Sequence, residues 1–302
     1  MNEYHYQFYG RHIISNIPLP ARSYLENSNA EYFSEVRIKG ILTNKVMKNE
    51  MTVTRDMYSI SSPRVSFQIQ LNPANITAYG SAEEHIVSTV FNLPFSLLLA
   101  HYGDFLLHCS CLLHNRNAYA ICAKKGSGKS LLAAHLCKRL HFLSDDTLCL
   151  QACGERIRGY GATKFIKLYR DAYESIKGTP EKFDLYRKNI QDKRYIDVND
   201  ICDTNNESEG DVKGLYFLRR LPGEDASITI TPVASLFQKR ALLFTHLVGS
   251  SFFPYSLLTQ MENSNIVGQM WDIPFHIVTV PTEIRRMDEI SDCIYQHICR
   301  EG

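Results

Sequence analysis

One segment constrains this chain more than any other, and it reads Ala123-Lys124-Lys125-Gly126-Ser127-Gly128-Lys129-Ser130. An apolar run precedes it, and the pattern from Ser130 to Leu140 predicts a helix after it. A glycine-rich turn between a strand and a helix directs backbone N–H groups at a phosphate, and the helix N-terminus favours negative charge. The segment fits GxxxxGK[ST] with Ala123 in place of the first glycine. The sequence therefore predicts a nucleoside-triphosphate site.

Within this loop, Gly126 and Gly128 let the backbone turn, Lys129 reaches the β- and γ-phosphates, and the Ser130 hydroxyl binds Mg²⁺. The alternative is a Gly/Ser turn that happens to precede a helix. We expect ATP and Mg²⁺ as cofactors, although nothing in the sequence separates ATP from GTP. We assign to the nucleotide site Ala123, Lys124, Lys125, Gly126, Ser127, Gly128, Lys129 and Ser130.

An acidic pair, Asp145-Asp146, follows the predicted strand His141 to Ser144. At that strand end a carboxylate can meet the Mg²⁺ bound by Ser130. Two adjacent carboxylates divide the work: one orients the metal, and the other accepts a proton from an attacking hydroxyl. The alternative is a solvated turn or a helix cap.

Composition excludes several classes of function. Lys plus Arg number 33 and Asp plus Glu 32, a formal charge of +1, so we expect neither a nucleic acid nor a membrane as partner. No apolar run reaches the roughly 18 residues of a membrane span. The nine cysteines are odd in number and lack zinc-knuckle spacing, which predicts reduced, buried thiols in a cytoplasmic protein. Cys109-Ser110-Cys111 as a redox pair is the alternative.

The pattern of residue types along the chain predicts two domains, residues 1–100 and 101–302. The first is β-rich, with a helix from Glu83 to Leu99 that Pro94 kinks or breaks. Its expected strands are Phe8 to Ile17, Ser34 to Leu42, Met51 to Ile60 and Val65 to Leu71.

The second predicted domain alternates strands and helices, which indicates an α/β core. Asp104 to Leu113 and Ala118 to Ala123 form a hairpin around Asn115-Arg116-Asn117, and Gly159-Tyr160-Gly161 is expected to be a turn. Further expected strands are Thr147 to Ala152, Val212 to Leu218, Ser227 to Thr231 and Phe275 to Val280. Expected helices are Arg170 to Lys177, Ser235 to Val248 and Met287 to Cys299, with a loop from Asn199 to Glu209.

Three elements in order resemble the catalytic domain of the HPr kinase/phosphorylase family: the Leu107-His108 pair, the glycine-rich loop, and the Asp145-Asp146 pair. The resemblance covers about residues 104–150. It implies an α/β fold with a P-loop (HPr kinase-like) nucleotide-binding core, here beside a β-rich N-terminal domain. It also implies a kinase that phosphorylates a serine on a peptide or small protein. By this resemblance Lys129 binds phosphate, Ser130 and Asp145 serve the metal, Asp146 accepts the proton, and His108 assists. A histidine alone in an apolar strand is otherwise a core residue.

The resemblance has a limit. The family's E-x-R-G-x-G segment corresponds to residues 156–161, where Arg156 replaces the metal-binding Glu. The whole-chain layout is more similar to HPr-kinase-like proteins found beside peptide natural-product genes. They share a Tyr-rich opening that ends in Leu-Pro and a G-D-F-L-L-H element. That likeness implies a tailoring kinase for the C-terminal serine of a lasso-peptide precursor.

Four basic residues are weaker candidates for substrate contact: Lys164, Lys167, Lys193 and Arg194. A cation there would offset charge near the transferred phosphate or pair with a peptide carboxylate, and a solvated surface is the alternative. Two other functions share the phosphate loop, namely a small-molecule kinase and a nucleotide-gated binding protein without transfer activity. The sequence is compatible with a homo-oligomer.

Overall fold

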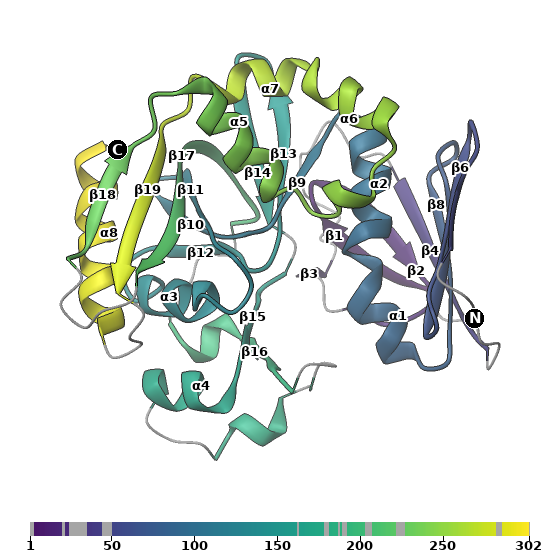
Figure 1. Cartoon of the computed structure of the whole chain (residues 1–302). Coiled ribbons are helices and arrows are strands. Elements are labelled where there is room, and N and C mark those ends of the chain that lie inside the picture. The colour runs from purple at the N-terminus through teal and green to yellow at the C-terminus, as the bar shows by residue number, and fades with distance from the viewer. Residues whose placement is uncertain are drawn as a thin grey trace.

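The computed structural model describes residues 3–19, 22–23, 35–43, 50–161, 163–177, 181–186, 188, 192–202, 207–221, 227–281 and 286–301. These residues form a mixed α/β fold with two large sheets, which confirms the predicted class at that level (Figure 1). None of the described helices combines the length and the apolar character needed to cross a bilayer.

The first sheet is built from the N-terminal part of the chain, in the order β3-β1-β2-β4-β8-β7-β6-β5. The β2–β4 and β4–β8 pairs are parallel, and the other pairs are antiparallel. The strands are β1 (Tyr4–Phe8), β2 (Arg11–Ser15), β3 (Arg22–Ser23), β4 (Glu35–Leu42), β5 (Glu50–Val53), β6 (Met57–Ser61), β7 (Val65–Gln70) and β8 (Asn75–Gly80).

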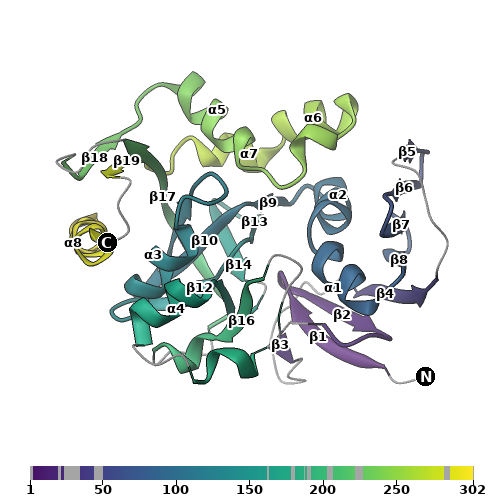
Figure 2. The ribbon, with the colours of Figure 1, turned by 60° about the horizontal axis from the view of Figure 1, so that its bottom comes forward.

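Two helices, α1 (Glu83–Val90) and α2 (Leu93–His101), lie between the first sheet and the second (Figures 1 and 2). Pro94 stands in the first turn of α2, where its missing N–H breaks no helical hydrogen bond. The expected break at Pro94 is confirmed. Helix α2 is buried nearly all round, so it can pack against both sheets.

The second sheet has the order β12-β10-β11-β17-β14-β13-β9, and β19 and β18 continue it beside the second half of β17. β11, β17 and β19 run parallel. The strands are β9 (Phe105–Leu107), β10 (Cys109–His114), β11 (Asn117–Cys122), β12 (His141–Ser144), β13 (Leu148–Cys153), β14 (Arg156–Gly161), β17 (Glu209–Leu221), β18 (Thr229–Pro232) and β19 (Phe275–Pro281).

Helices cover both faces of this sheet. α3 (Lys129–Leu136) and α8 (Met287–Glu301) lie on one face, where Tyr119, Ile121 and Tyr216 join their apolar side chains in one core. Alternate residues such as Cys122 and Phe217 point to the other face and belong to a core shared with the first sheet. That second core also receives residues from α5 (Leu236–Thr245), α6 (Tyr255–Glu262) and α7 (Asn265–Met270), and η3 (Ser250–Phe252) stands between α5 and α6.

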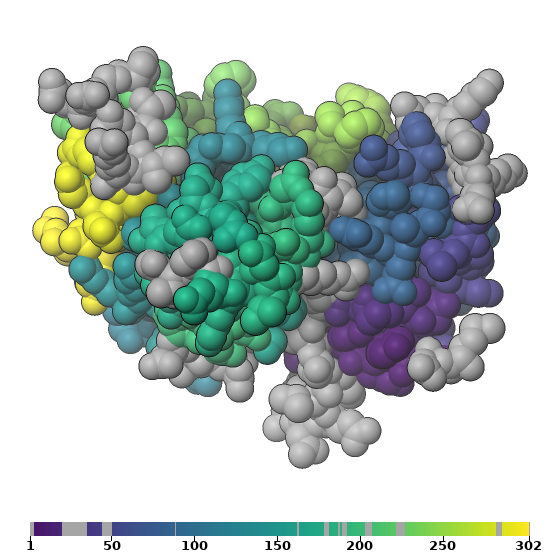
Figure 3. Space-filling view, turned by 90° about the horizontal axis from the view of Figure 1, so that it is seen from below, coloured from purple at the N-terminus to yellow at the C-terminus, as the bar shows by residue number. Residues whose placement is uncertain are grey.

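A small third unit pairs β15 (Phe165–Leu168) with β16 (Arg194–Asp197). It carries α4 (Arg170–Lys177) and the short 3₁₀ turns η1 (Phe183–Leu185) and η2 (Val198–Asp200). From below, this teal-green unit covers the middle of the molecule, with α8 at one edge and the purple N-terminal strands toward the other (Figure 3).

Several sequence expectations need correction. Residues 159–161 are not a turn but the end of β14. A Cβ on Gly161 would lie 2.3 Å from the Leu143 carbonyl oxygen, so the glycine serves close strand packing. Three expected single strands are each divided, at Tyr9-Gly10, at the Thr54–Met57 turn and at His108.

Other predicted elements are present in the structure, and part of one predicted loop lies outside the described residues. The hairpin at Asn115-Arg116 is confirmed, with φ of 51° and 66°. In the expected loop from Asn199 to Glu209, η2 precedes residues 203–206, which lie outside the described residues, and β17 begins at Glu209. β12 and α4 have the predicted bounds, and the remaining expected elements occur with shifted ends, whereas β3, β8, β14, β15, β16, α6 and α7 were not predicted. None of the nine cysteines, all of them described, forms a disulfide, and five are buried.

Candidate active site around the glycine-rich loop

The glycine-rich loop connects the end of β11 to the start of α3. Gly126 and Gly128 both have φ of +82°, the left-handed region that glycine enters without strain. Ser127 closes the turn, since its N–H and its hydroxyl both donate to the Lys124 carbonyl oxygen, at 3.2 and 2.6 Å. The loop thus has the strand–turn–helix setting that its sequence predicted.

Lys129 is buried, with 6% of its surface exposed. Its Nζ lies 3.8 Å from Asp145 Oδ1 and 3.8 Å from Asp146 Oδ1, and it makes no hydrogen bond to any described residue. A buried ammonium with three donors requires acceptor atoms. This orphaned group fits a ligand that brings anionic oxygens to the loop.

Asp145 is fixed by three hydrogen bonds. Its Oδ1 accepts from the hydroxyls of Ser110, at 2.5 Å, and Ser130, at 3.0 Å, while its Oδ2 accepts from the Lys167 backbone N–H at 3.2 Å. A serine hydroxyl and a carboxylate oxygen therefore adjoin at the start of α3. Hard oxygen donors of this kind suit Mg²⁺.

Asp146 occupies the left-handed region, with φ of 70°, and faces Lys167, whose Nζ lies 2.6 Å from its Oδ2. Burial would raise the pKa of Asp146, but the charges of Lys167 and Lys129 outweigh it and hold that pKa well below its ordinary value. Despite its burial, Lys167 has a raised pKa because of Asp146. Both groups are ionised at neutral pH.

His108 stands in the break between β9 and β10, where its backbone N–H donates to the His246 carbonyl oxygen at 2.7 Å. Burial, and then the charge of Lys129, lowers the pKa of His108 to about 4. The imidazole is therefore neutral at pH 7. Sequence reasoning placed it inside a strand, whereas the structure ends β9 before it.

A cavity of about 400 Å³ joins these groups. Its walls include the loop from Lys124 to Ser130 together with His108 and Asp146, and α1 and the α1–α2 junction contribute Thr89 and Asn92. The N-terminal part of the chain thus forms one wall, which the sequence did not predict. A hydrogen bond also joins the N-terminal part of the chain to the site, between the Tyr9 hydroxyl and Thr147, next to Asp146.

The four weaker candidates divide into two pairs. Lys167 and Lys193 line the cavity. Lys164 instead pairs with Asp197 at 2.5 Å, and Arg194 contacts Asp184 at 3.5 Å. Arg156, at the position of the family's Glu, pairs with Asp211 at 3.0 Å on the sheet.

Arg220 contacts the loop and was not among the candidate residues from the sequence. Its Nε donates to the Ser127 carbonyl oxygen at 2.7 Å and its Nη1 to the Pro281 carbonyl oxygen at 2.9 Å. The parallel pairing of β11 with β17 places Phe217 beside Cys122, the last residue of β11, so the end of β17, which carries Arg220, runs alongside the loop that follows β11. The only signal in the sequence is a pair of arginines at the end of a predicted strand.

The two loop glycines provide a matched prediction. Alanine at either position adopts a left-handed φ, which costs about 1–2 kcal/mol. A Cβ on Gly128 would also lie 2.7 Å from Arg220 Nη2 and 2.9 Å from Met287 Cε, whereas a Cβ on Gly126 meets nothing within 4 Å. Both atoms end flexible side chains, but turning Arg220 aside would loosen its hydrogen bonds to Ser127 and Pro281, so we expect Gly128→Ala to lose a further ~0.5–1.5 kcal/mol of unfolding free energy in urea denaturation. Equal losses in the two variants would contradict the close contact at Gly128.

Of three comparisons with known proteins, the one with solved structures finds similar chains and the other two find none. No protein-family model matches the chain. A search of curated proteins finds no match either. Among solved structures, the chain is similar to the HPr(Ser) kinase/phosphatase from Coxiella burnetii, at 14% sequence identity. The alignment covers 65% of this chain and 99% of that one, with a TM-score of 0.35. A likeness this remote assigns neither a fold family nor a function.

Proposed function

We propose that this chain is an ATP- and Mg²⁺-dependent kinase that phosphorylates a serine hydroxyl on a peptide or small protein. The observation that supports it most is Lys129, a buried ammonium without a hydrogen-bond acceptor among the described residues, set between two aspartates beside a glycine-rich turn. A structural lysine would have its donors satisfied. A phosphate-binding lysine obtains its acceptors from the phosphate oxygens of the ligand.

The residues fit the expected cofactors. The loop from Ala123 to Ser130 and the Lys129 ammonium would hold the phosphates, and Ser130 and Asp145 would hold Mg²⁺. When bound, ATP supplies the phosphoryl group and Mg²⁺ offsets its charge. The protein's own contribution is positioning and electrostatics, because phosphoryl transfer has a loose transition state with little covalent chemistry for side chains.

Asp146 would orient the acceptor. Its carboxylate stays ionised at pH 7 and can accept a hydrogen bond from a serine hydroxyl, which aims an oxygen lone pair into the cavity. The hydroxyl proton then passes to this carboxylate. The depressed pKa makes Asp146 a weak base, so orientation is the larger part of its role. Lys167 offsets nearby negative charge, and neutral His108 adds no competing cation.

The proposal that the acceptor is a peptide is based on the residues that line the cavity. Lys193 and Lys167 both line the cavity, and a lysine there can pair with the carboxylate at the end of a peptide. This favours a C-terminal serine, such as that of a lasso-peptide precursor, because such a residue carries the hydroxyl and the carboxylate together.

The test uses the purified protein with ATP and Mg²⁺. Precursor peptides from neighbouring genes are offered with a free C-terminal serine and, as the matched control, with that serine amidated. We expect the mass of one HPO₃ on the free peptide and much less on the amide. Transfer only to small hydroxylated metabolites would assign a small-molecule kinase instead, and nucleotide binding without any transfer would contradict kinase activity.

A further inference from the structure

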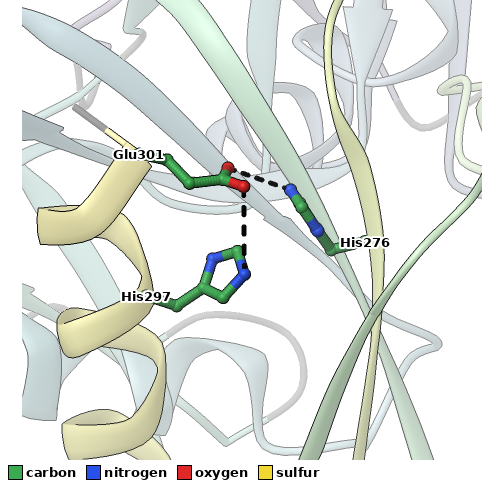
Figure 4. A group of neighbouring side chains, drawn as sticks. All are labelled: His276, His297 and Glu301. Carbon is green, nitrogen blue, oxygen red and sulfur yellow. Dashed lines mark hydrogen bonds and ion pairs between the residues drawn. The ribbon is translucent and has the colours of Figure 1, made fainter.

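A second cluster of metal-ligating side chains lies at the C-terminal end of α8, away from the glycine-rich loop. His297 and Glu301 are four residues apart on α8, and His276 faces them from β19. Both imidazoles point toward the same carboxylate (Figure 4). His276 Nε2 lies 3.1 Å from Glu301 Oε2, and His297 Nε2 lies 3.9 Å from Glu301 Oε1.

The spacing suits one small cation. One ring nitrogen from each histidine and one carboxylate oxygen all lie within 4.8 Å of one another. Zinc bonds of about 2.0–2.1 Å in a tetrahedron separate neighbouring ligand atoms by about 3.4 Å. The two histidine–carboxylate distances, 3.1 Å to Oε2 and 3.9 Å to Oε1, lie on either side of that value, so side-chain rotations that bring one oxygen of Glu301 to both rings complete the geometry.

The surroundings also hold the ligands in place. The hydroxyl of Tyr216 lies 3.0 Å from His297 Nδ1, which leaves Nε2 of that ring to face Glu301. The His276 ring stacks on Tyr216, with centroids 5.0 Å apart, and is 3% exposed. A partner on the second ring nitrogen is the usual support of a metal-bound histidine. Glu301 is exposed, so a metal can enter and keep a water as fourth ligand.

We propose that His276, His297 and Glu301 form a binding site for a zinc-class divalent cation. All three residues lie outside the set that lines the cavity at the glycine-rich loop. His276 Nδ1 makes no hydrogen bond to any described residue, so only His297 has a supporting partner. Affinity is therefore lower than that of a fully supported zinc site, by about 10- to 100-fold.

The metal would fasten the C-terminal half of α8 to β19. The N-terminal half of α8 is already fastened to α3, since Asp288 pairs with His135 at 2.8 Å and Asp292 pairs with Arg139 at 2.8 Å. Met287, at the start of α8, lies near Gly128 of the loop. The site therefore secures a helix that supports the loop from outside, and its expected role is structural.

The test titrates the metal-free full chain with Zn²⁺ by calorimetry and with Co²⁺ by visible absorption. We expect one equivalent of Zn²⁺, a tetrahedral cobalt spectrum and a raised unfolding temperature. Tyr216→Phe should weaken binding by about 10- to 100-fold, and His297→Ala and Glu301→Gln by more.

Two controls separate this site from other donors. His12→Ala removes a ring from another histidine pair, whose nitrogens lie 3.0 Å apart, and should leave the affinity unchanged. A thiolate charge-transfer band in the cobalt spectrum would assign the metal to cysteine and overturn the proposal. Absence of binding to the intact chain, or unchanged binding in both His297→Ala and Glu301→Gln, would also overturn it.

Discussion

Replacing Lys129 by alanine is expected to weaken ATP binding by roughly 100- to 10⁴-fold. The Nζ atom lies between Asp145 and Asp146 without a hydrogen-bond acceptor among the described residues. Two charge-assisted hydrogen bonds to phosphate oxygens, at about 1.5–3 kcal/mol each, account for that range. The fold should persist, because Asp145 keeps its three hydrogen bonds and Asp146 keeps Lys167. Calorimetric titration with ATP and Mg²⁺ measures the effect.

Lys213→Ala is the matched control, since it removes the same charge from an exposed position outside the cavity. Its effect on ATP affinity should be small, because an exposed cation is screened by solvent and salt. Equal losses in both variants would mean that net charge, and not the position of Lys129, sets the affinity. Unchanged binding in Lys129→Ala would remove the main support for a nucleotide site.

The sequence was sufficient to predict features that depend on residues close together along the chain. A turn that needs two left-handed glycines before a helix has few other solutions, so the loop from Ala123 to Ser130 could be located within the fold. The Asp145–Ser130 contact was also expected, because the acidic pair follows the first strand after the helix that carries Ser130. Pro94 likewise marked a helix start by local chemistry alone.

Features that depend on strand pairing could not be predicted. Arg220 meets Ser127 only because β17 lies parallel to β11, and no local pattern encodes that pairing. Gly159 and Gly161 looked like turn residues, yet both lie in a strand: a Cβ would be 2.3 Å from the Leu143 carbonyl oxygen at Gly161, and 3.2 Å from the Leu148 and Val212 side chains at Gly159. The same applies to the cavity wall at Thr89 and Asn92, which belongs to the predicted first domain.

The two lysines near β15 are a further case in which the sequence could not predict a contact. Lys164 stands just before β15 and Lys167 within it, and composition alone gives no reason to prefer one. In the structure Lys167 contacts Asp146, whereas Lys164 forms an ion pair with Asp197. A basic residue becomes relevant to chemistry through the carboxylate it faces. Asp146 lies in the turn between β12 and β13 of the large sheet, so the sequence around the lysines does not show which of them faces it.

Asp146→Asn is expected to lower turnover by about 10²–10⁴-fold while leaving ATP affinity within a few-fold of the original. Asparagine keeps the size of the side chain and tolerates the left-handed backbone, with φ of 70°, better than alanine would. Its amide oxygen can still accept from Lys167, so that cation is not left without a partner. What is lost is a carboxylate able to orient a serine hydroxyl and take its proton. Single-turnover phosphorylation of the peptide, read by mass, together with calorimetric ATP titration, measures both quantities.

Asp171→Asn provides the matched control, because Asp171 is an exposed carboxylate on the wall of the same cavity. It changes the charge of the cavity by the same amount, so a loss specific to Asp146 reflects its position rather than net charge. The two leading functions then separate cleanly. A kinase loses transfer in Asp146→Asn and retains the nucleotide, whereas a protein that uses ATP only as a gating ligand keeps its activity in both variants. Full turnover in Asp146→Asn would move the role of orienting the acceptor away from this residue, and neutral His108, whose ring lies against the Asp146 backbone, would be the next group to replace.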